Sequence, residues 1–425
     1  MSIPKSLLGK ISTRKNLEAA WQDVSRLARP FSHGASEQTI VDFRLNLKAN
    51  LETIRTELLA GNYKFGAVRA FTIKKKNGKK RPLKIADIRD RVVQRAITRV
   101  LEKYLQKPFG LDNQASYAYL ANRGVQSAIK RMLQLHNEGF FIILEADIVK
   151  FFDNVNVDKL LDEMIFPRLP DATLNHLIKG AFEMEISNKY ELPEEDWELY
   201  PESSAGLPQG GYLSPLFSNV YLSGFDRLML QSNYKLIRYA DDFIVMCKTK
   251  LEADDAYQLA KKILEADLGL KLHERNDSDN KSKTRVINVN QTPIKFLGIE
   301  FNGVRTWPDG EKRLQFSNKL SGISSNTLNI TAFLISVNHL LEGWVSAYSF
   351  TDLTDDYLHS LDQEINKVLW TTLYKFGWKL KPRFLSDEQR INSGIRLATW
   401  YLDSRRGKFK DDDKELLSKY WSVLI

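Results

Sequence analysis

The chain has 425 residues, of which 43% are hydrophobic and 27% are charged. This composition is ordinary for a globular protein and excludes collagen-like, low-complexity and wholly disordered chains, while the length favours two or three domains. The 62 Lys and Arg outnumber the 53 Asp and Glu, and the resulting net charge of +9 favours a polyanionic partner.

The N-terminal third predicts mostly helices with one hairpin. Two strand-like runs, 67–74 and 81–85, flank Asn77-Gly78, which is a hairpin turn signal with basic residues around it. A basic tip of this kind predicts a clamp for phosphate groups. Apolar residues recur at helical spacing in four segments, 16–29, 38–59, 89–105 and 124–136.

The middle of the chain contains the strongest strand signals. An almost wholly apolar run over 140–146 ends in Asp147, as in a buried central strand that delivers a carboxylate at its end. Two β-rich runs around Ala240-Asp241-Asp242 predict a tight hairpin with two carboxylates at its turn. Helices are predicted over 157–184, 213–230 and 251–268.

The second half of the chain predicts a loop, a further hairpin and then a helical module. The acidic segment 191–202 is expected to be an exposed loop with no role in the core. Segments 294–303 and 313–316 predict a further hairpin. Beyond about residue 319 the pattern is helical, over 330–348 and 357–374.

Asp147, Asp241 and Asp242 are candidate metal ligands, because sheet pairing would bring the end of the apolar strand to the hairpin turn. Adjacent side chains diverge along a strand unless a turn or a shared cation holds them. Carboxylates that lie close together repel one another, and their hard oxygen atoms select Mg²⁺ with a phosphate-bearing substrate. For Asp241-Asp242 alone, the alternative is ordinary turn chemistry, since Asp is common in turns.

Gly210-Gly211 precedes a predicted helix and follows Pro208. Glycines at this place would allow a base pair to approach the backbone closely. The alternative is a loop whose glycines only supply unusual backbone angles. The single Cys247, the tryptophans Trp344, Trp370 and Trp378, and the six histidines are expected to be ordinary core or surface residues.

Five blocks, in this order along the chain, resemble those of reverse transcriptases. They are Lys80–Leu83 with Arg89–Gln94, Glu145–Asp153, Leu207–Gly210, Arg238–Asp242 and Phe296–Gly298. Further segments are similar to bacterial enzymes of the group II intron type, namely Tyr63, Ser116-Tyr117, Arg123-Gly124 with Ala128, Lys283-Thr284, and Gly343-Trp344 with Tyr348.

This resemblance implies an α+β right-hand polymerase. Its expected parts are an N-terminal extension with fingers over 1–135, a palm with an antiparallel sheet over 136–310, a helical thumb over 311–385 and a short C-terminal helical extension over 386–425. The three aspartates would then be the catalytic residues and would bind two Mg²⁺ ions, which Mn²⁺ can replace, with the carbonyl of Ile148 as an extra ligand. Such ions, about 3.5–4 Å apart, would activate a 3′-hydroxyl and stabilise the leaving pyrophosphate.

The resemblance also implies roles in substrate binding. Lys74 and Arg81 would contact the triphosphate, since arginine suits bidentate phosphate contacts. Phe152 falls at the family's steric-gate position, where its ring would exclude a 2′-hydroxyl; the alternative is an ordinary core phenylalanine. The remaining implied contacts are Gln209 and Gly210 with the incoming nucleotide, and Tyr239, Ala240, Lys283, Phe296, Leu297 and Gly298 with primer and template.

Two departures separate the chain from typical intron enzymes. Residues 380–425 contain no Cys or His, so a metal-dependent nuclease module is not expected, and His33-Gly34-Ala35-Ser36 stands where a Gly-x-Asp-Gly element is common. We therefore expect a free-standing bacterial RNA-directed DNA polymerase that copies a structured, nearby-encoded non-coding RNA into cDNA from dNTPs in antiphage defence. The alternatives are an intron-encoded reverse transcriptase and maturase, a retron-type enzyme, and an RNA-binding splicing factor with secondary polymerase activity.

The expected location is the bacterial cytoplasm, with no membrane partner. A single cysteine excludes an intramolecular disulfide and favours a reducing compartment. The first residues lack an apolar core of signal-peptide length, and no stretch reaches about 18 uncharged apolar residues.

Overall fold

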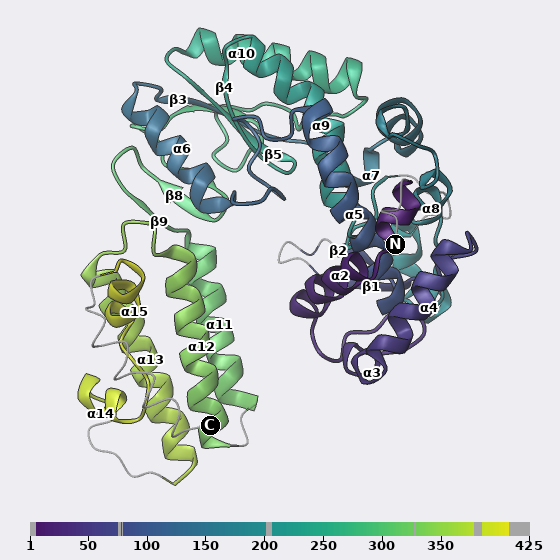
Figure 1. Cartoon of the computed structure of the whole chain (residues 1–425). Helices are drawn as coiled ribbons and strands as arrows, with labels where there is room; N and C mark the ends of the chain where they lie inside the picture. Colours follow the sequence, from purple (N-terminus) through teal and green to yellow (C-terminus); the bar gives the residue numbers. More distant parts are fainter. Residues whose placement is uncertain are drawn as a thin grey trace. The chain divides into compact units, whose positions relative to one another are not determined.

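The structure is a computed structural model that describes residues 6–74, 78, 80–200, 206–326, 329–377 and 385–407. Helices and strands both occur, so the protein is of the mixed α+β class, as expected (Figure 1). The chain divides into two compact units, Met1–Ile287 and Asn288–Ile425. Within the described residues, no helix is both long and apolar enough to cross a membrane.

The first unit contains most of the helices that the sequence predicts. The predicted helix over 38–59 is divided in two, because Asn46 leaves the helical region with φ −119° and ψ 32°. The expected helix over 157–184 is also interrupted, since Pro167 and Pro170 cannot donate a backbone hydrogen bond. The α-helices are α1 (Leu7–Ile11), α2 (Arg14–Leu27), α3 (Ile40–Leu45), α4 (Leu47–Leu59), α5 (Ile88–Phe109), α6 (Val125–Asn137), α7 (Phe151–Asn154), α8 (Asn175–Gly180), α9 (Ser214–Gln231) and α10 (Lys250–Lys262). Shorter π and 3₁₀ segments are Lys159–Ile165, Phe166–Arg168, Lys189–Glu191, Glu194–Leu199 and Ile263–Asp267.

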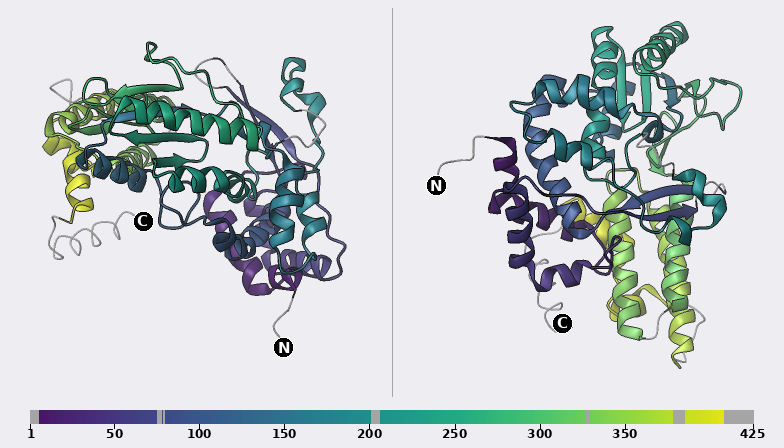
Figure 2. Two further views of the ribbon diagram at one scale, coloured as in Figure 1. Left: turned by 90° about the horizontal axis from the view of Figure 1, so that it is seen from above. Right: turned by 90° about the vertical axis from the view of Figure 1, so that its right-hand side faces the viewer.

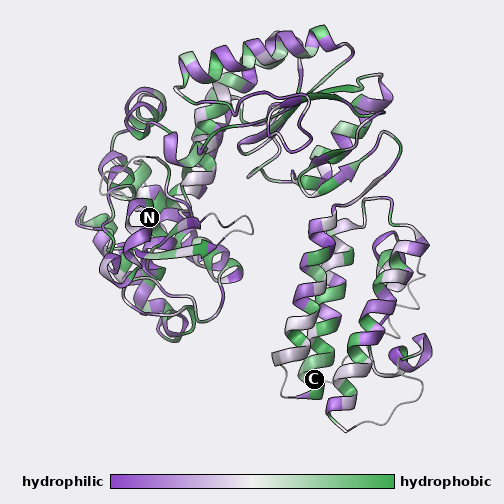
Figure 3. Ribbon diagram, turned by 180° about the vertical axis from the view of Figure 1, so that it is seen from behind, coloured by the Kyte–Doolittle hydropathy of each residue, from purple (hydrophilic) through white to green (hydrophobic). Residues whose placement is uncertain are grey.

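A four-stranded sheet forms the centre of the first unit. Its order is β4 (Lys235–Tyr239), β5 (Asp242–Cys247), β3 (Ile142–Asp147) and β6 (Arg285–Asn288). Strand β5 runs antiparallel to both β3 and β4. The sheet is mostly hydrophobic (Figure 3), and α6, α9 and α10 pack against it, with α10 running along the sheet in Figure 2. The prediction that the run before Asp147 is an inner strand is therefore confirmed.

The predicted hairpin near residue 77 is formed by β1 (Arg69–Lys74) and β2 (Lys80–Ile85), which pair antiparallel. Most of its basic tip lies outside the described residues.

The single cysteine, Cys247, ends strand β5. Its burial confirms that it is a core residue and raises the pKa of its thiol to about 12.

The acidic segment 191–202 is exposed only in part: Glu194 and Glu195 are exposed, as the sequence predicts, whereas residues 201–202 lie outside the described residues. Asp196 is 3% exposed and Tyr200 is fully buried. The ammonium group of Lys80 forms an ion pair with Asp196, and the hydroxyl groups of Thr72 and Tyr200 hydrogen-bond at 3.1 Å. The expectation of no role in the core was wrong, because an ion pair and a hydroxyl hydrogen bond hold this segment to the β1–β2 hairpin.

The second unit combines a small sheet with helices. Its strands β7 (Ile294–Phe296), β8 (Ile299–Phe301) and β9 (Thr306–Pro308) are antiparallel, and its helices are α11 (Gly310–Asn326), α12 (Ile330–Tyr348), α13 (Asp355–Lys375), α14 (Asp387–Asn392) and α15 (Ala398–Arg405). The prediction of a strand over 313–316 was wrong, because these residues belong to α11 and β9 pairs with β8 instead. Trp344, 8% exposed, lies in the core as expected, Trp370 is half-buried, and Trp378 lies outside the described residues.

Candidate active site

The three candidate aspartates lie together at one edge of the central sheet. Asp147 ends β3 and is the direct cross-strand partner of Asp242, the first residue of β5. Asp241 belongs to the turn between β4 and β5, beside Ala240 in the left-handed conformation with φ 58°. Residues far apart in the sequence therefore meet through strand pairing, which is the arrangement that the pattern of apolar runs predicts.

Burial and neighbouring charges raise the proton affinity of two of these carboxylates, Asp241 and Asp242. Burial by the surrounding atoms, together with the charges of Asp241 and Asp147, raises the pKa of Asp242 to about 7, although its side chain still reaches solvent. Burial also raises the pKa of Asp241, and the charge of Asp147 adds to this effect. An arrangement that disfavours its own negative charge gains stability from a cation.

A lysine supplies positive charge next to Asp147. The Lys283 ammonium group forms an ion pair with the Asp147 carboxylate. His273 Nε2 lies 3.6 Å from Asp147 Oδ2 and 3.4 Å from Lys283 Nζ. Sequence reasoning treated every histidine as ordinary and so missed His273. Its place depends on a backbone bridge between Ile148 and Leu272, for which the sequence has no local signal.

The donor atoms at this edge suit a hard divalent cation. Carboxylate oxygens are the ligands that Mg²⁺ prefers, and it commonly binds through one or two carboxylates with substrate phosphates and water. Among the residues that the structure describes, no three His, Cys, Asp or Glu side chains form a preassembled metal cluster. The fit therefore rests on the donor type and on the raised pKa of Asp242.

A cavity of about 800 Å³ in the first unit contains the candidate nucleotide-binding residues Arg81, Phe152, Gln209 and Gly210. Arg81 Nε donates a hydrogen bond to Gln209 Oε1 at 2.7 Å. Phe152 is half-buried and packs edge-on against Phe151, with 5.4 Å between ring centroids. Lys74 is exposed at the end of β1 and is not among the residues that line this cavity.

The loop that carries Gln209 is fixed at two points. Leu207 N donates to Phe152 O at 2.7 Å, and Lys84 N donates to Gln209 O at 3.1 Å. Gly206 has φ +83°, and a Cβ atom there would lie 2.3 Å from Phe152 O, so only glycine fits. The loop thereby joins strand β2 to the segment that follows β3.

The other candidate contacts divide between the two units. Tyr239 and Ala240 precede Asp241 in the first unit. In the second unit, Phe296 ends β7, and Leu297 and Gly298 form its turn to β8 with φ 54° and 79°. Two central residues with positive φ are typical of a two-residue hairpin turn.

The structure adds Tyr119 to the site, which the sequence did not predict. Its ring lines the same cavity and is half exposed. Burial raises the pKa of its phenol, and the negative charge of Asp241 raises it further. The cavity is therefore close enough to the aspartates for their charges to act on it. Tyr119 has φ 61°, which is uncommon for a residue other than glycine. No pattern in the sequence announces this conformation.

Comparison with known proteins agrees with this arrangement. The family described as reverse transcriptase (RNA-dependent DNA polymerase) matches residues 73–301, which is more than half of the chain. The chain belongs to the reverse transcriptase family and is an RNA-directed DNA polymerase by class. The matched region contains all three aspartates, the cavity residues Arg81 and Phe152, and the loop with Gln209.

Individual relatives include proteins of group II introns. Protein YkfC of Escherichia coli (strain K12) is 31% identical over 291 residues, which cover 59% of this chain and 71% of YkfC. The group II intron-encoded protein LtrA of Lactococcus lactis subsp. cremoris is 29% identical over 214 residues, covering 50% of this chain and 34% of LtrA. Thus the matched part spans about a third of LtrA. In the solved partial Cas6-RT-Cas1–Cas2 complex, a chain that is 22% identical superposes with a TM-score of 0.36, covering 62% of this chain and 43% of that one.

Proposed function

We propose that this chain extends a primer 3′-hydroxyl with deoxynucleotides on an RNA template, using Asp147, Asp241 and Asp242 to hold two Mg²⁺ ions. The observation that carries the proposal is the cross-strand pairing of Asp147 with Asp242 beside the turn that contains Asp241. The Ile148 carbonyl, which follows Asp147 directly, is the proposed extra ligand. When bound, the ions would activate the primer hydroxyl and stabilise the leaving pyrophosphate, and Mn²⁺ could replace Mg²⁺.

The residues of the cavity bind and select the nucleotide. Arg81 presents its guanidinium group to the triphosphate, and Gln209 orients Arg81 through their hydrogen bond. Gly210 lets the base pair approach the loop, and Lys74 adds positive charge at the end of β1. Phe152 places its ring where a 2′-hydroxyl would enter, so deoxynucleotides are preferred.

Primer and template contacts are proposed for residues on both units. Tyr239 and Ala240 lie on the turn before the aspartates, and Lys283 pairs with Asp147 until a cation takes its place. Phe296, Leu297 and Gly298 supply a tight turn that supports the primer end.

The proposed division is fingers over 1–135, palm over 136–310, thumb over 311–385 and a C-terminal extension over 386–425. The β1–β2 hairpin, the central sheet and the helices α11–α13 support the first three parts. In the second unit, a cavity of about 340 Å³ between α11 and α12 is lined by Lys312, Lys319, Gly343 and Trp344. The two lysines suit contact with the phosphates of a nucleic acid duplex.

We propose that the template is a structured non-coding RNA encoded nearby and that its cDNA serves antiphage defence in the bacterial cytoplasm. The net charge of +9 supports a nucleic acid substrate. The second candidate is an intron-encoded reverse transcriptase and maturase, which the 29% identity with LtrA favours. A retron-type enzyme and an RNA-binding splicing factor are further outcomes that one experiment can separate.

That experiment recovers the protein from its native host, with and without phage infection, and sequences the bound RNA and any cDNA. The matched sample carries Asp241→Ala and Asp242→Ala. A defined non-coding RNA, with cDNA and phage resistance that both need the aspartates, supports the proposal. A spliced intron RNA identifies the intron class, cDNA linked to its own template RNA identifies a retron, and bound RNA whose effect survives the substitutions identifies a binding protein.

A further inference from the structure

We propose that Arg238 is a positioning residue for the two adjacent aspartates, acting through the backbone carbonyl of Ala240. The proposal rests on the proposed function, because it takes Asp241 and Asp242 as the metal-binding groups. Arg238 is the second-to-last residue of β4 and is fully buried, so it touches neither substrate nor metal.

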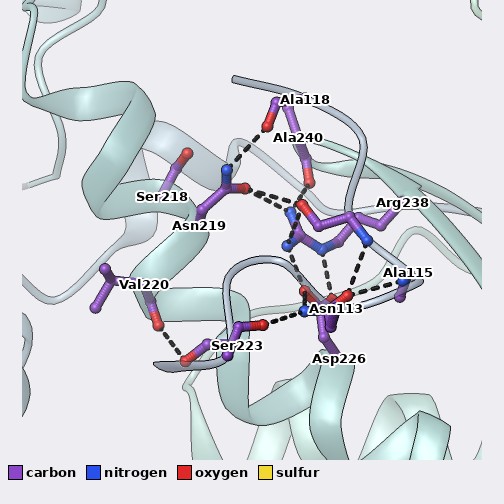
Figure 4. Close-up of polar contacts among 12 residues, drawn as sticks. Asn113, Ala115, Ala118, Ser218, Asn219, Val220, Ser223, Asp226, Arg238 and Ala240 are labelled. Atoms are coloured by element: carbon purple, nitrogen blue, oxygen red, sulfur yellow. Dashed lines mark hydrogen bonds and ion pairs between the residues drawn. The ribbon is translucent and has the colours of Figure 1, made fainter. Parts of the chain in front are cut away.

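All five N–H groups of Arg238 have an acceptor. Nε and Nη2 donate to the two carboxylate oxygens of Asp226, at 2.6 and 2.5 Å. Nη1 donates to Asn219 Oδ1 at 3.1 Å and to Ala240 O at 2.9 Å (Figure 4). Nη2 also donates to Ser116 Oγ at 3.0 Å. A guanidinium group carries five donors in a rigid fork, so no other side chain can make this set of bonds.

The Ala240 carbonyl is the contact that links this network to the site. Ala240 has φ 58°, and the left-handed conformation costs a residue with a Cβ atom about 1–2 kcal/mol. A hydrogen bond from a charged, buried donor to its carbonyl offsets that cost. Because Asp241 and Asp242 follow directly, the direction of both carboxylates depends on the backbone of Ala240.

Helix α9 and the loop before α6 anchor the arginine. Asp226 and Asn219 both belong to α9 and are buried, at 1% and 2% exposure. The backbone of Arg238 is held as well, since its N donates to Ala115 O at 2.7 Å and its O accepts from Tyr117 N at 2.9 Å. The turn is therefore fixed to a rigid helix and not only to its own hairpin.

The same network reaches the nucleotide cavity. Asn219 lines that cavity, and its Nδ2 donates to Ala118 O at 2.9 Å (Figure 4). Ala118 precedes Tyr119, which also lines the cavity. Arg238 bonds the metal-binding turn directly but reaches the cavity wall only through Asn219, so its loss should alter metal affinity more than nucleotide affinity.

The test compares Arg238→Lys with Arg390→Lys in the full chain. Arg390 is also fully buried and donates to Asp362 Oδ1 at 2.6 Å, but it lies in the second unit. For Arg238→Lys we expect the Mg²⁺ concentration at half-maximal rate to rise about tenfold, the effect of one lost hydrogen bond from a charged donor. The KM for dNTP at saturating Mg²⁺ should change less than about twofold, whereas Arg390→Lys should leave the Mg²⁺ requirement within about twofold of wild type.

Two measurements separate positioning from a general structural role. Binding of Mn²⁺ to the protein, followed by the electron paramagnetic resonance signal of the free ion, should weaken in Arg238→Lys and not in Arg390→Lys. Adding Ala240→Gly to Arg238→Lys should recover part of the Mg²⁺ affinity, because glycine adopts the left-handed conformation without cost. If Arg238→Lys does not fold, Ser116→Ala, which removes one acceptor of the guanidinium group, should raise the Mg²⁺ requirement about two- to threefold.

Failure of this inference differs from failure of the proposed function. If Asp241→Asn with Asp242→Asn keeps polymerisation, the proposed function is wrong. If that variant is inactive while Arg238→Lys, or Ser116→Ala in its place, has the metal requirement and Mn²⁺ binding of wild type, only the role of Arg238 is overturned.

Discussion

Two fully buried arginines, one in each unit, show how the same interaction can serve different purposes. Arg238 and Arg390 each pair with an aspartate, Asp226 and Asp362. Every N–H group of Arg238 is bonded, and one bond leads to the turn before Asp241. Among the described residues, Arg390 Nε has no hydrogen-bond partner, and Arg390 Nη2 donates to Arg396 O at 2.6 Å.

Burial and charge pairing alone therefore do not indicate function. Asp362 also accepts from Ala398 N at 3.0 Å, so the second pair fixes the beginning of α15 to α13. The first pair fixes a strained turn whose next residues are carboxylates. The two arginines differ in the partners of their other hydrogen bonds. These partners, rather than the ion pair itself, distinguish a positioning group from a packing group.

The largest expected effect on catalysis comes from replacing Asp147, a carboxylate of the candidate active site. Asp147→Asn should lower the polymerisation rate by at least about 10³-fold, because metal binding supplies several kcal/mol of transition-state stabilisation. Its thermal stability should stay close to wild type. The measurement is single-nucleotide incorporation on an RNA template, with melting followed by circular dichroism.

Asp362→Asn, in the second unit, should lower the stability of the fold and leave the polymerisation rate almost unchanged. Removing one partner of a buried pair costs about 3–5 kcal/mol of unfolding free energy, which urea denaturation would measure. The incorporation rate per folded molecule should remain within a few-fold of wild type. A variant at Asp362 that folds normally yet loses the chemistry would contradict the separation of the two pairs.

Replacing Phe152 tests whether the cavity in the first unit selects deoxynucleotides over ribonucleotides. Phe152→Ala should raise incorporation of ribonucleotides relative to deoxynucleotides by about 10–200-fold, the range expected when a pocket no longer excludes one small group. Competition between rGTP and dGTP on one template gives the ratio directly. The alternative, a purely structural phenylalanine, predicts lower stability with an unchanged ratio.

The pH dependence of folding provides a smaller effect. The pKa of Asp242 in the folded protein, about 7, exceeds its ordinary value of 3.8. In metal-free protein this group therefore destabilises the fold increasingly as pH rises from about 4 to about 7, and Asp242→Asn should remove that part of the pH dependence. Since Asp242 reaches solvent, we expect a difference of about 1 kcal/mol, measured by urea unfolding across this range. Addition of Mg²⁺ should reduce the difference, and an identical pH profile for the variant would contradict the assignment.

The smallest expected effect lies in the second unit. A Cβ atom at Gly343, inside α12, would meet no atom of the described residues within 4 Å, and this residue lines the cavity beside Trp344. Gly343→Ala should raise the unfolding free energy by about 0.5–1 kcal/mol, while the added methyl group weakens binding of a primer–template duplex a few-fold. Fluorescence anisotropy with labelled duplex measures the affinity, and unchanged or tighter binding would exclude this cavity from the duplex interface.

Much of the site could be predicted from the sequence because its signals are local. The apolar run before Asp147 and the hairpin around Asp241 each depend on neighbouring residues, and strand pairing does the rest. The acidic segment could not be placed, because its structure depends on Lys80 and Thr72, more than a hundred residues earlier. The same holds for His273 and Tyr119, whose positions follow from long-range backbone contacts rather than from a local pattern.

The break at Asn46 and the helix over 313–316 show a different limit. In both places the apolar spacing suits more than one local structure, and tertiary packing decides between them. The role of Arg238 was also hidden, since the sequence places it beside the aspartates but does not reveal that its side chain bonds the Ala240 carbonyl.

Primer extension on a defined RNA template, with wild type and the Asp241→Asn, Asp242→Asn double variant side by side, tests directly whether these aspartates perform the chemistry. We predict Mg²⁺-dependent DNA synthesis by wild type and none above background by the variant, with equal binding of the primer–template. DNA synthesis by the variant at a rate near that of wild type would show that this edge of the central sheet is not the place of the chemistry.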